Sequence, residues 1–281
     1  MYFVRKFSSP LGEEVDPVDL VKNNQEKRSV TRKKNLTTKE REIEELVDRL
    51  VSICGVQSKT NTKTMKYRLG ELLKLKSNPT IVVPVCPDYG HDGKKYTFNG
   101  LFGGVSLLTQ KHIEFLDNVT PILPKSAVIF LLADHEADDP DLCRVVEKTR
   151  EEFADLMLSS LFETRKEILS RGWFATFMTA FIPHLISDEE SITKEILNDS
   201  SLGGWLRDDT ESRRDMYRRI NGGISFTEMT RRTAHTTAQY VALGRFATEA
   251  RYLVCNHTTT NLAWYKRKTN VALLHNDVRV Y

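Results

Sequence analysis

The sequence predicts an α/β protein with a mostly parallel sheet flanked by helices and a helical N-terminal extension. Two observations predict this class. Two short runs rich in β-branched residues, 80–86 and 127–133, have the continuous apolar character of strands that are buried on both faces. A helical pattern separates these runs, and a strand, helix, strand order returns near the C-terminus. Strands that alternate with helices normally pair in parallel.

The bulk composition is that of a folded globular protein. Of 281 residues, 40% are apolar and 28% are charged, which is long and apolar enough for a sizeable core. The net charge of +3 excludes a polybasic protein, so any nucleic-acid contact needs a local patch. Four scattered cysteines without a CxxC pair predict neither a zinc knuckle nor a disulfide framework. Without an apolar run long enough for a signal peptide or a membrane span, we expect a cytoplasmic protein with no membrane and no DNA partner.

The N-terminal region is expected to contain an arm and one helix. Residues 1–36 lack a periodic apolar face and end in a basic stretch, so we predict a flexible charged arm. Thr37 and Glu40 can form a capping box that opens a helix at about 38–54. Residues 37–281 are expected to form a single α/β domain.

The rest of the chain is expected to alternate strands and helices. The first strand leads through a Gly-rich polar loop to a helix and the second strand, a βαβ unit with a right-handed crossover. A long helix, an apolar core helix and a largely helical segment broken near Gly203-Gly204 follow. The expected ranges are the loop 89–104, helices 107–116, 141–170 and 173–182, the helical segment 186–250, strand 251–255, helix 260–268, strand 270–275 and a turn at 276–277.

Polar side chains follow three of the expected strands at the end where parallel sheets bind ligands. A cluster of reactive groups at such exits is typical of a site rather than of a packed core. The candidates are Cys86, Asp88 and Tyr89 after the first strand, Asp134 and Glu136 after the second, and Asn256 and His257 after the C-terminal strand.

Each candidate also has a structural explanation. Cys86 can be a buried thiol, and Asp134 to Glu136 can be a solvated loop that feeds the next helix. Asn256 and His257 can cap a helix while offering an imidazole as acid or base. Gly103 and Gly104 allow a backbone to approach a substrate, but they form no GxGxxG or Walker motif, so no nucleotide cofactor is expected. The acidic and histidine residues lack metal-ligand spacing, so no metal is expected.

Paired arginines form a second kind of candidate site. Such a cluster can contact tRNA phosphates as a local patch, or it can be a solvated helix face. The residues are Arg214, Arg218, Arg219, Arg231 and Arg232.

Three short matches and the order of elements resemble one known family. Cys86 ends the first strand, Tyr240 and Gly244 lie one helical turn apart, and Asn256-His257 ends a later strand before a helix and a last strand. Over roughly 78–281 this resembles the tRNA-dependent cyclodipeptide synthases, whose Rossmann-like fold is related to the catalytic domain of class I aminoacyl-tRNA synthetases. In that family a Ser stands at the position of Cys86, a Glu at that of Gly244 and a Tyr at that of Asn256.

The resemblance implies an aminoacyltransferase that joins two aminoacyl groups from charged tRNAs without ATP. Cys86 would accept the first aminoacyl group as a thioester, and Cys86, Tyr240 and His257 would line one pocket. Glu136 or Glu249 would take the place of the missing carboxylate. The partner would be aminoacyl-tRNA, with no cofactor.

Two other interpretations remain open. Asp134 and the loop 94–104 would suit an isonitrile synthase of the pyoverdine or dityrosine biosynthesis type, which acts on a free amino acid, although the Lys-Ser-x-Asn stretch of that class is absent. The chain would otherwise be a noncatalytic RNA- or protein-binding relative that uses its helices around 208–250.

Overall fold

The structure of the chain is a computed structural model. Its contacts divide it into two units, residues 1–45 and 46–281, and everything below concerns the second unit unless stated. Helix α2 (Thr38–Ser52) begins in the first unit, where Thr37 and Glu40 form the predicted capping box through the Thr37 and Glu40 backbone N–H groups. The structure describes residues 36–54, 59–85, 89–91, 96–98, 105–134, 140–145, 147–182, 184–212, 214, 224–256 and 268–276.

The core of the second unit is a five-stranded parallel sheet, which confirms the predicted class. Its strand order is β5-β4-β1-β6-β7, and each neighbouring pair is parallel. Every residue of β1 is buried, as its uninterrupted apolar sequence predicts for a central strand. The strands are β1 (Ile81–Val85), β4 (Val128–Leu132), β5 (Phe174–Phe177), β6 (Leu253–Asn256) and β7 (Ala272–His275).

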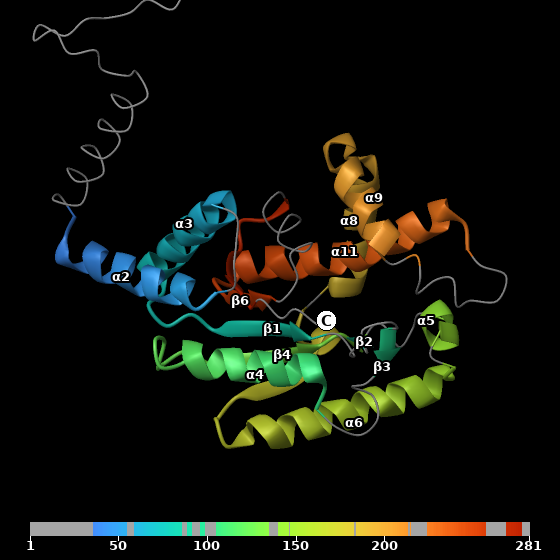
Figure 1. The fold of residues 1–281 in the computed structure, drawn as a ribbon, viewed down its shortest axis with the longest axis horizontal. Helices are drawn as coiled ribbons and strands as arrows, with labels where there is room; N and C mark the ends of the chain where they lie inside the picture. Colours follow the sequence, from blue (N-terminus) through green and yellow to red (C-terminus); the bar gives the residue numbers. More distant parts are fainter. Residues whose placement is uncertain are drawn as a thin grey trace, which may run out of the picture. The chain divides into compact units, whose positions relative to one another are not determined.

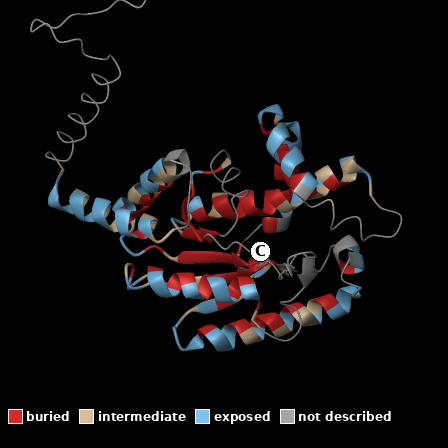
Figure 2. Ribbon diagram, viewed as in Figure 1, coloured by how far each residue is buried: buried red, intermediate tan, exposed pale blue. Residues whose placement is uncertain are grey.

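Helices cover both faces of this sheet. Alternate strand residues, including Val82, Leu131 and Val254, face a core built with α11 (Phe226–Glu249) and α8 (Leu185–Asn198). The opposite face is covered by α4 (Leu107–Val119) and α6 (Arg150–Leu169), which Figure 1 shows on the other side of β1 and β4. Figure 2 shows buried residues filling the central strand β1 and the middle of α11, whereas buried and exposed residues alternate along α6. The remaining helices are α3 (Lys59–Leu75), α5 (Pro140–Val145), α7 (Met178–Phe181), the 3₁₀ turn η2 (Ser200–Leu202) and α9 (Gly203–Ser212).

The largest error in the sequence-based prediction concerns residues 173–182. They were expected to be one core helix, but the structure forms strand β5 and the short helix α7. β5 pairs with β4, with Ile129 opposite Phe174 and Leu132 opposite Phe177, so this aromatic segment forms an edge strand of the sheet. A short apolar segment rich in aromatic residues suits either element, and only the open edge of β4 decides between them.

Four further differences are local. The expected helix 141–170 is divided into α5 and α6, because Thr149 and Glu152 form a capping box that starts α6. Helix α3 was not predicted, although Leu69, Leu72 and Leu73 give it a buried face. The expected loop 89–104 contains an antiparallel pair, β2 (Tyr89–His91) and β3 (Tyr96–Phe98). The helical break expected at Gly203-Gly204 falls at 199–202, and both glycines start α9. Residues 1–35, 221–223, 260–267 and 277 lie outside the described residues.

Candidate functional site

The order of the sheet defines where a ligand is expected to bind. From β1 the chain continues to β4 and β5 on one side, then crosses to β6 and β7 on the other. At such a reversal the connections after the two adjacent strands leave toward opposite faces and open a crevice beyond their carboxyl ends. Here those ends are Val85 of β1 and Asn256 of β6. By this rule a ligand is expected at the exits of β1 and β6 rather than at the exit of β4.

Tyr240 and Asn256 lie on the same face of the sheet near this edge. Asn256 follows Val254 by two residues, so strand alternation directs it toward α11, and its side chain is fully buried. Helix α11 leads directly into β6 and must run antiparallel to it. Tyr240 lies ten residues before Ala250, about 15 Å of helix, while β6 rises about 13 Å from Tyr252 to Asn256. Tyr240, which is 8% exposed, is thus level with the end of β6.

Asp134 joins the ends of β4 and β5. Its carboxylate accepts hydrogen bonds from the backbone N–H of Thr179, at 3.0 Å, and from the Thr179 hydroxyl. Thr179 lies in the first turn of α7, so Asp134 stabilises the start of a helix whose N-cap, Phe177, has no side-chain cap. This half-buried carboxylate connects the end of β4 to the start of α7, and each of its oxygens already accepts a hydrogen bond from Thr179.

A buried polar cluster supports β6 and β7 from the α4 side. His112 Nδ1 lies 3.6 Å from Cys255 Sγ and 3.5 Å from Asn276 Nδ2, and Asn276 also donates to the Lys111 carbonyl. Burial raises the pKa of the Cys255 thiol well above its usual value and that of Cys54 to about 11. Both thiols are therefore protonated at neutral pH, which suits packing and not nucleophilic attack.

A second buried polar cluster lies where α8 meets α11. Glu189 is 5% exposed, lies 3.0 Å from His235 Nε2 and accepts a hydrogen bond from the Gln239 side chain. Gln239 directly precedes Tyr240, so this contact fixes the segment of α11 that carries the candidate tyrosine. A single sequence carries no signal for this contact, because Glu189 is one of several acidic residues near a helix start.

The position of the expected carboxylate is occupied by Gly244, which is buried one turn beyond Tyr240. Glu249 does not replace it, because that side chain is exposed nine residues from Tyr240, about 13 Å along the helix. This corrects the expectation for Glu249.

Each of the three described arginines of the predicted tRNA patch pairs with a carboxylate. Arg214 binds Glu211 and stacks on the Phe226 ring, while Arg231 and Arg232 share Glu228. Arg231 lowers the pKa of Glu228, so this carboxylate remains charged and partly neutralises the patch. Arg218 and Arg219 lie outside the described residues.

Several predicted site residues cannot be placed. Tyr89 belongs to β2, but its side chain is not described, so the prediction that Cys86, Tyr240 and His257 share a pocket stays a prediction. Within the described part of the chain, no three His, Cys, Asp or Glu side chains are grouped to hold a metal ion, and no helix is long and apolar enough to cross a membrane. The candidates outside the described residues are Cys86, Asp88, Gly103, Gly104, Glu136 and His257.

One of three similar solved structures supports the fold. No family model and no curated protein sequence matches the chain. Tyrosyl-tRNA synthetase complexed with L-tyrosine, from Archaeoglobus fulgidus, aligns at 12% identity and a TM-score of 0.50 over 84% of this chain but 63% of its own length. The CDPS of Staphylococcus haemolyticus aligns at 9% identity and a TM-score of 0.47 over 76% of this chain and 94% of its own. PvcA of Pseudomonas aeruginosa aligns at 12% and 0.49 over 83% of each chain. The synthetase match supports a fold like that of class I aminoacyl-tRNA synthetases.

Proposed function

We propose that this chain is an enzyme that acts on aminoacyl groups, and specifically an aminoacyltransferase of the tRNA-dependent cyclodipeptide synthase type. The observation that carries the proposal is the reversal of strand order at β1. It makes β1 and β6 neighbours, and these are the strands that Cys86 and His257 follow in the sequence. Open parallel sheets bind their ligands beyond such a pair of strands. The synthetase-like fold adds an aminoacyl substrate as the ligand class.

In the proposed reaction, the Cys86 sulfur attacks the ester carbonyl of an aminoacyl-tRNA. A thioester forms, the ester bond to the tRNA ribose breaks, and the thiol proton passes to the departing ribose oxygen. The amine of a second aminoacyl group then attacks the thioester and releases the Cys86 thiol, with His257 as the acid or base. Attack by the first residue's amine on the second ester closes the ring and releases the second tRNA.

To act as an acceptor, the Cys86 thiol needs a lower pKa than the thiols of Cys54 and Cys255. Cys54 and Cys255 have raised pKa values because they are buried. An acceptor thiol needs a thiolate at neutral pH, and hence an exposed position or a cationic neighbour such as a protonated imidazole.

Intact mass spectrometry after incubation with charged tRNAs tests this function. We expect a labile aminoacyl adduct and cyclic dipeptide with the unmodified chain, no adduct with Cys86→Ala, and an unchanged adduct with Cys54→Ala as the matched thiol control. Cys86→Ser should retain some activity through an oxygen ester. Absence of both adduct and product with every aminoacyl-tRNA would exclude the proposal.

The same assay separates the alternatives. Turnover of a free amino acid without tRNA would favour the isonitrile synthase interpretation. Salt-dependent tRNA binding without any turnover would favour a noncatalytic relative.

A further inference from the structure

Helix α6 has two separate apolar sides. One side packs on the sheet through residues that include Phe153, Met157 and Ile168. The other side bears Leu158, Phe162 and Leu169, which are 42%, 55% and 75% exposed. At 100° per residue these three project within about 40° of one another and roughly 120° from the buried side. An isolated exposed leucine needs no explanation, but three large apolar side chains in one row do.

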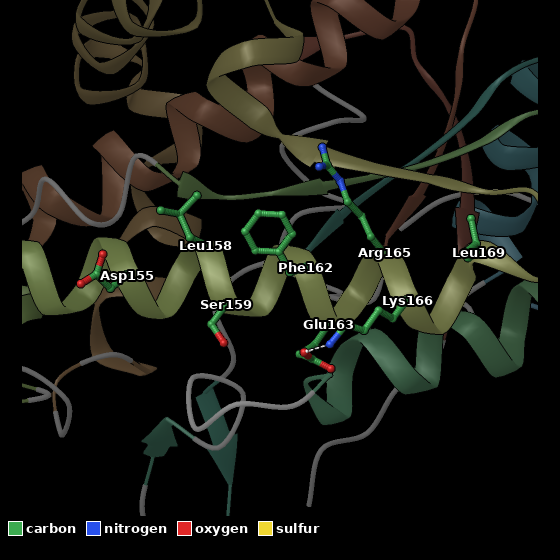
Figure 3. A pocket seen from close by; sticks show the side chains of 8 residues that line it. All are labelled: Asp155, Leu158, Ser159, Phe162, Glu163, Arg165, Lys166 and Leu169. Carbon is green, nitrogen blue, oxygen red and sulfur yellow. Dashed lines mark hydrogen bonds and ion pairs between the residues drawn. The ribbon is translucent and has the colours of Figure 1, made fainter.

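This row borders a shallow hollow of about 690 Å³ on the outer surface of α6. Figure 3 shows Leu158, Phe162 and Leu169 along one border of the helix, and the ion pair of Glu163 with Lys166 along the other. We call this surface the α6 face. It is lined by Asp155, Leu158, Ser159, Phe162, Glu163, Arg165, Lys166 and Leu169.

The charges of the α6 face are arranged to complement a second α6 face. Asp155 lies toward the N-terminal end of the row and Arg165 ten residues later, about 15 Å along the helix. If two such helices lie antiparallel in the register where paired residue numbers sum to 320, Leu158 meets Phe162 and Asp155 meets Arg165. Each pairing then occurs twice. This register joins Leu158 with Phe162 and also joins the opposite charges, while Leu169 at each end lies opposite Glu151.

We propose that a second copy of this chain docks on the α6 face, with α6 antiparallel to α6 across a twofold axis that crosses the face at the level of residue 160. A twofold contact places the same patch on both partners, so a self-complementary row is what it needs. The antiparallel arrangement also opposes the two helix dipoles favourably. Two carboxylates and two cations line the face, which gives it no net charge and disfavours nucleic acid or anionic lipid as its occupant. This proposal is independent of the proposed function.

Light scattering and sedimentation of the full chain over a range of concentrations test the proposal. We expect a dimer for the unmodified chain and a monomer for Phe162→Glu, which places a charge in the apolar row of both copies. Because Phe162 is half exposed, the fold should survive, and the melting temperature checks this. Leu75→Glu introduces the same kind of change at a 64% exposed leucine on α3 and should leave the dimer intact.

Charge variants test the register. Asp155→Lys opposes Arg165 with a like charge at both ends and should weaken the dimer by about tenfold or more. The double variant D155K/R165E recreates both ion pairs and should recover most of the loss. Its melting temperature needs checking, because Arg165 Nε also donates to the Ala175 carbonyl. A monomeric unmodified chain at about 100 µM, or a dimer that survives both Phe162→Glu and Asp155→Lys, overturns the proposal.

Discussion

Helices α6 and α11 cover opposite faces of one sheet, and among the described residues α11 has a second helix, α8, packed behind it while α6 has none. The outer side of α11 meets α8 through the Glu189 cluster and through the ion pair of Arg245 with Glu195. Among the described residues, the outer side of α6 carries exposed apolar side chains instead. In Figure 2 buried residues predominate in the middle of α11, whereas along α6 they form one row among exposed residues. An apolar row on a helix therefore indicates a contact without saying whether the same chain supplies it.

The largest expected effect is the loss of stability caused by Leu243→Ala on α11, which we compare with Leu158→Ala on α6. Leu243→Ala on α11 removes a fully buried side chain and should lower the free energy of unfolding by about 2–5 kcal/mol. Leu158→Ala on α6 removes a 42% exposed side chain and should cost less than about 1 kcal/mol in the monomer. Urea denaturation at a protein concentration that keeps the chain monomeric measures both. Equal losses would mean that the two helices are covered alike.

The cover of α11 depends on a buried polar contact. Glu189→Ala leaves the Gln239 amide without this acceptor at a buried position and should cost about 1–3 kcal/mol. Glu189→Gln retains a carbonyl that can accept the same hydrogen bond, so it should cost clearly less. The two denaturation midpoints decide the matter, and a loss that is equal for both variants would assign the effect to the charge of Glu189 rather than to the hydrogen bond.

The stability of the C-terminal end of α8 is expected to depend on pH, because Asp199 at that end pairs with Lys268. This lysine binds Asp199 at 2.6 Å and Glu195 at 3.1 Å, and with Ser201 it lowers the pKa of Asp199 to about 2. A lowered carboxylate pKa stabilises the folded state above the unfolded value of 3.8, and this contribution is lost as pH falls toward 2.

Lys268→Met should therefore destabilise the chain at pH 6 and lose less stability than the unmodified chain between pH 4 and 2. Urea midpoints across that range measure the difference. Lys194→Met, which removes an exposed pairing with Glu190 on the same helix, is the matched control. If the urea midpoints of the two variants fall in parallel with pH, Lys268 does not link α8 to β7, the strand that follows it.

The sequence predicted the sheet better than it predicted what surrounds the site. β1 and β4 were identified because uninterrupted apolar runs are distinctive, and Asn256 proved to be the last residue of β6. β5 was misread because Phe174 to Phe177 suits a helix or a strand until a neighbour is known. The contact of His112 with Cys255 joins residues 143 positions apart, and that of Glu189 with Gln239 joins residues 50 apart. Such pairings have no local signal in a single sequence.

The smallest expected effect concerns the first turns of α11, where the predicted tRNA patch lies. Arg231 is more than half exposed and shares Glu228 with Arg232, so two positive charges already face one negative charge. Arg231→Ala should change the free energy of unfolding by less than about 1 kcal/mol, because exposed ion pairs contribute little.

If tRNA binds here, removing both arginines should reduce the salt dependence of tRNA binding. The slope of log K for tRNA binding against log salt should fall by at most about 1, since Glu228 neutralises one arginine and a free phosphate contact accounts for about 0.7–0.9. The variant Glu228→Gln releases both arginines and should strengthen tRNA binding, whereas no response to any of the three variants would remove the start of α11 from the tRNA-binding surface.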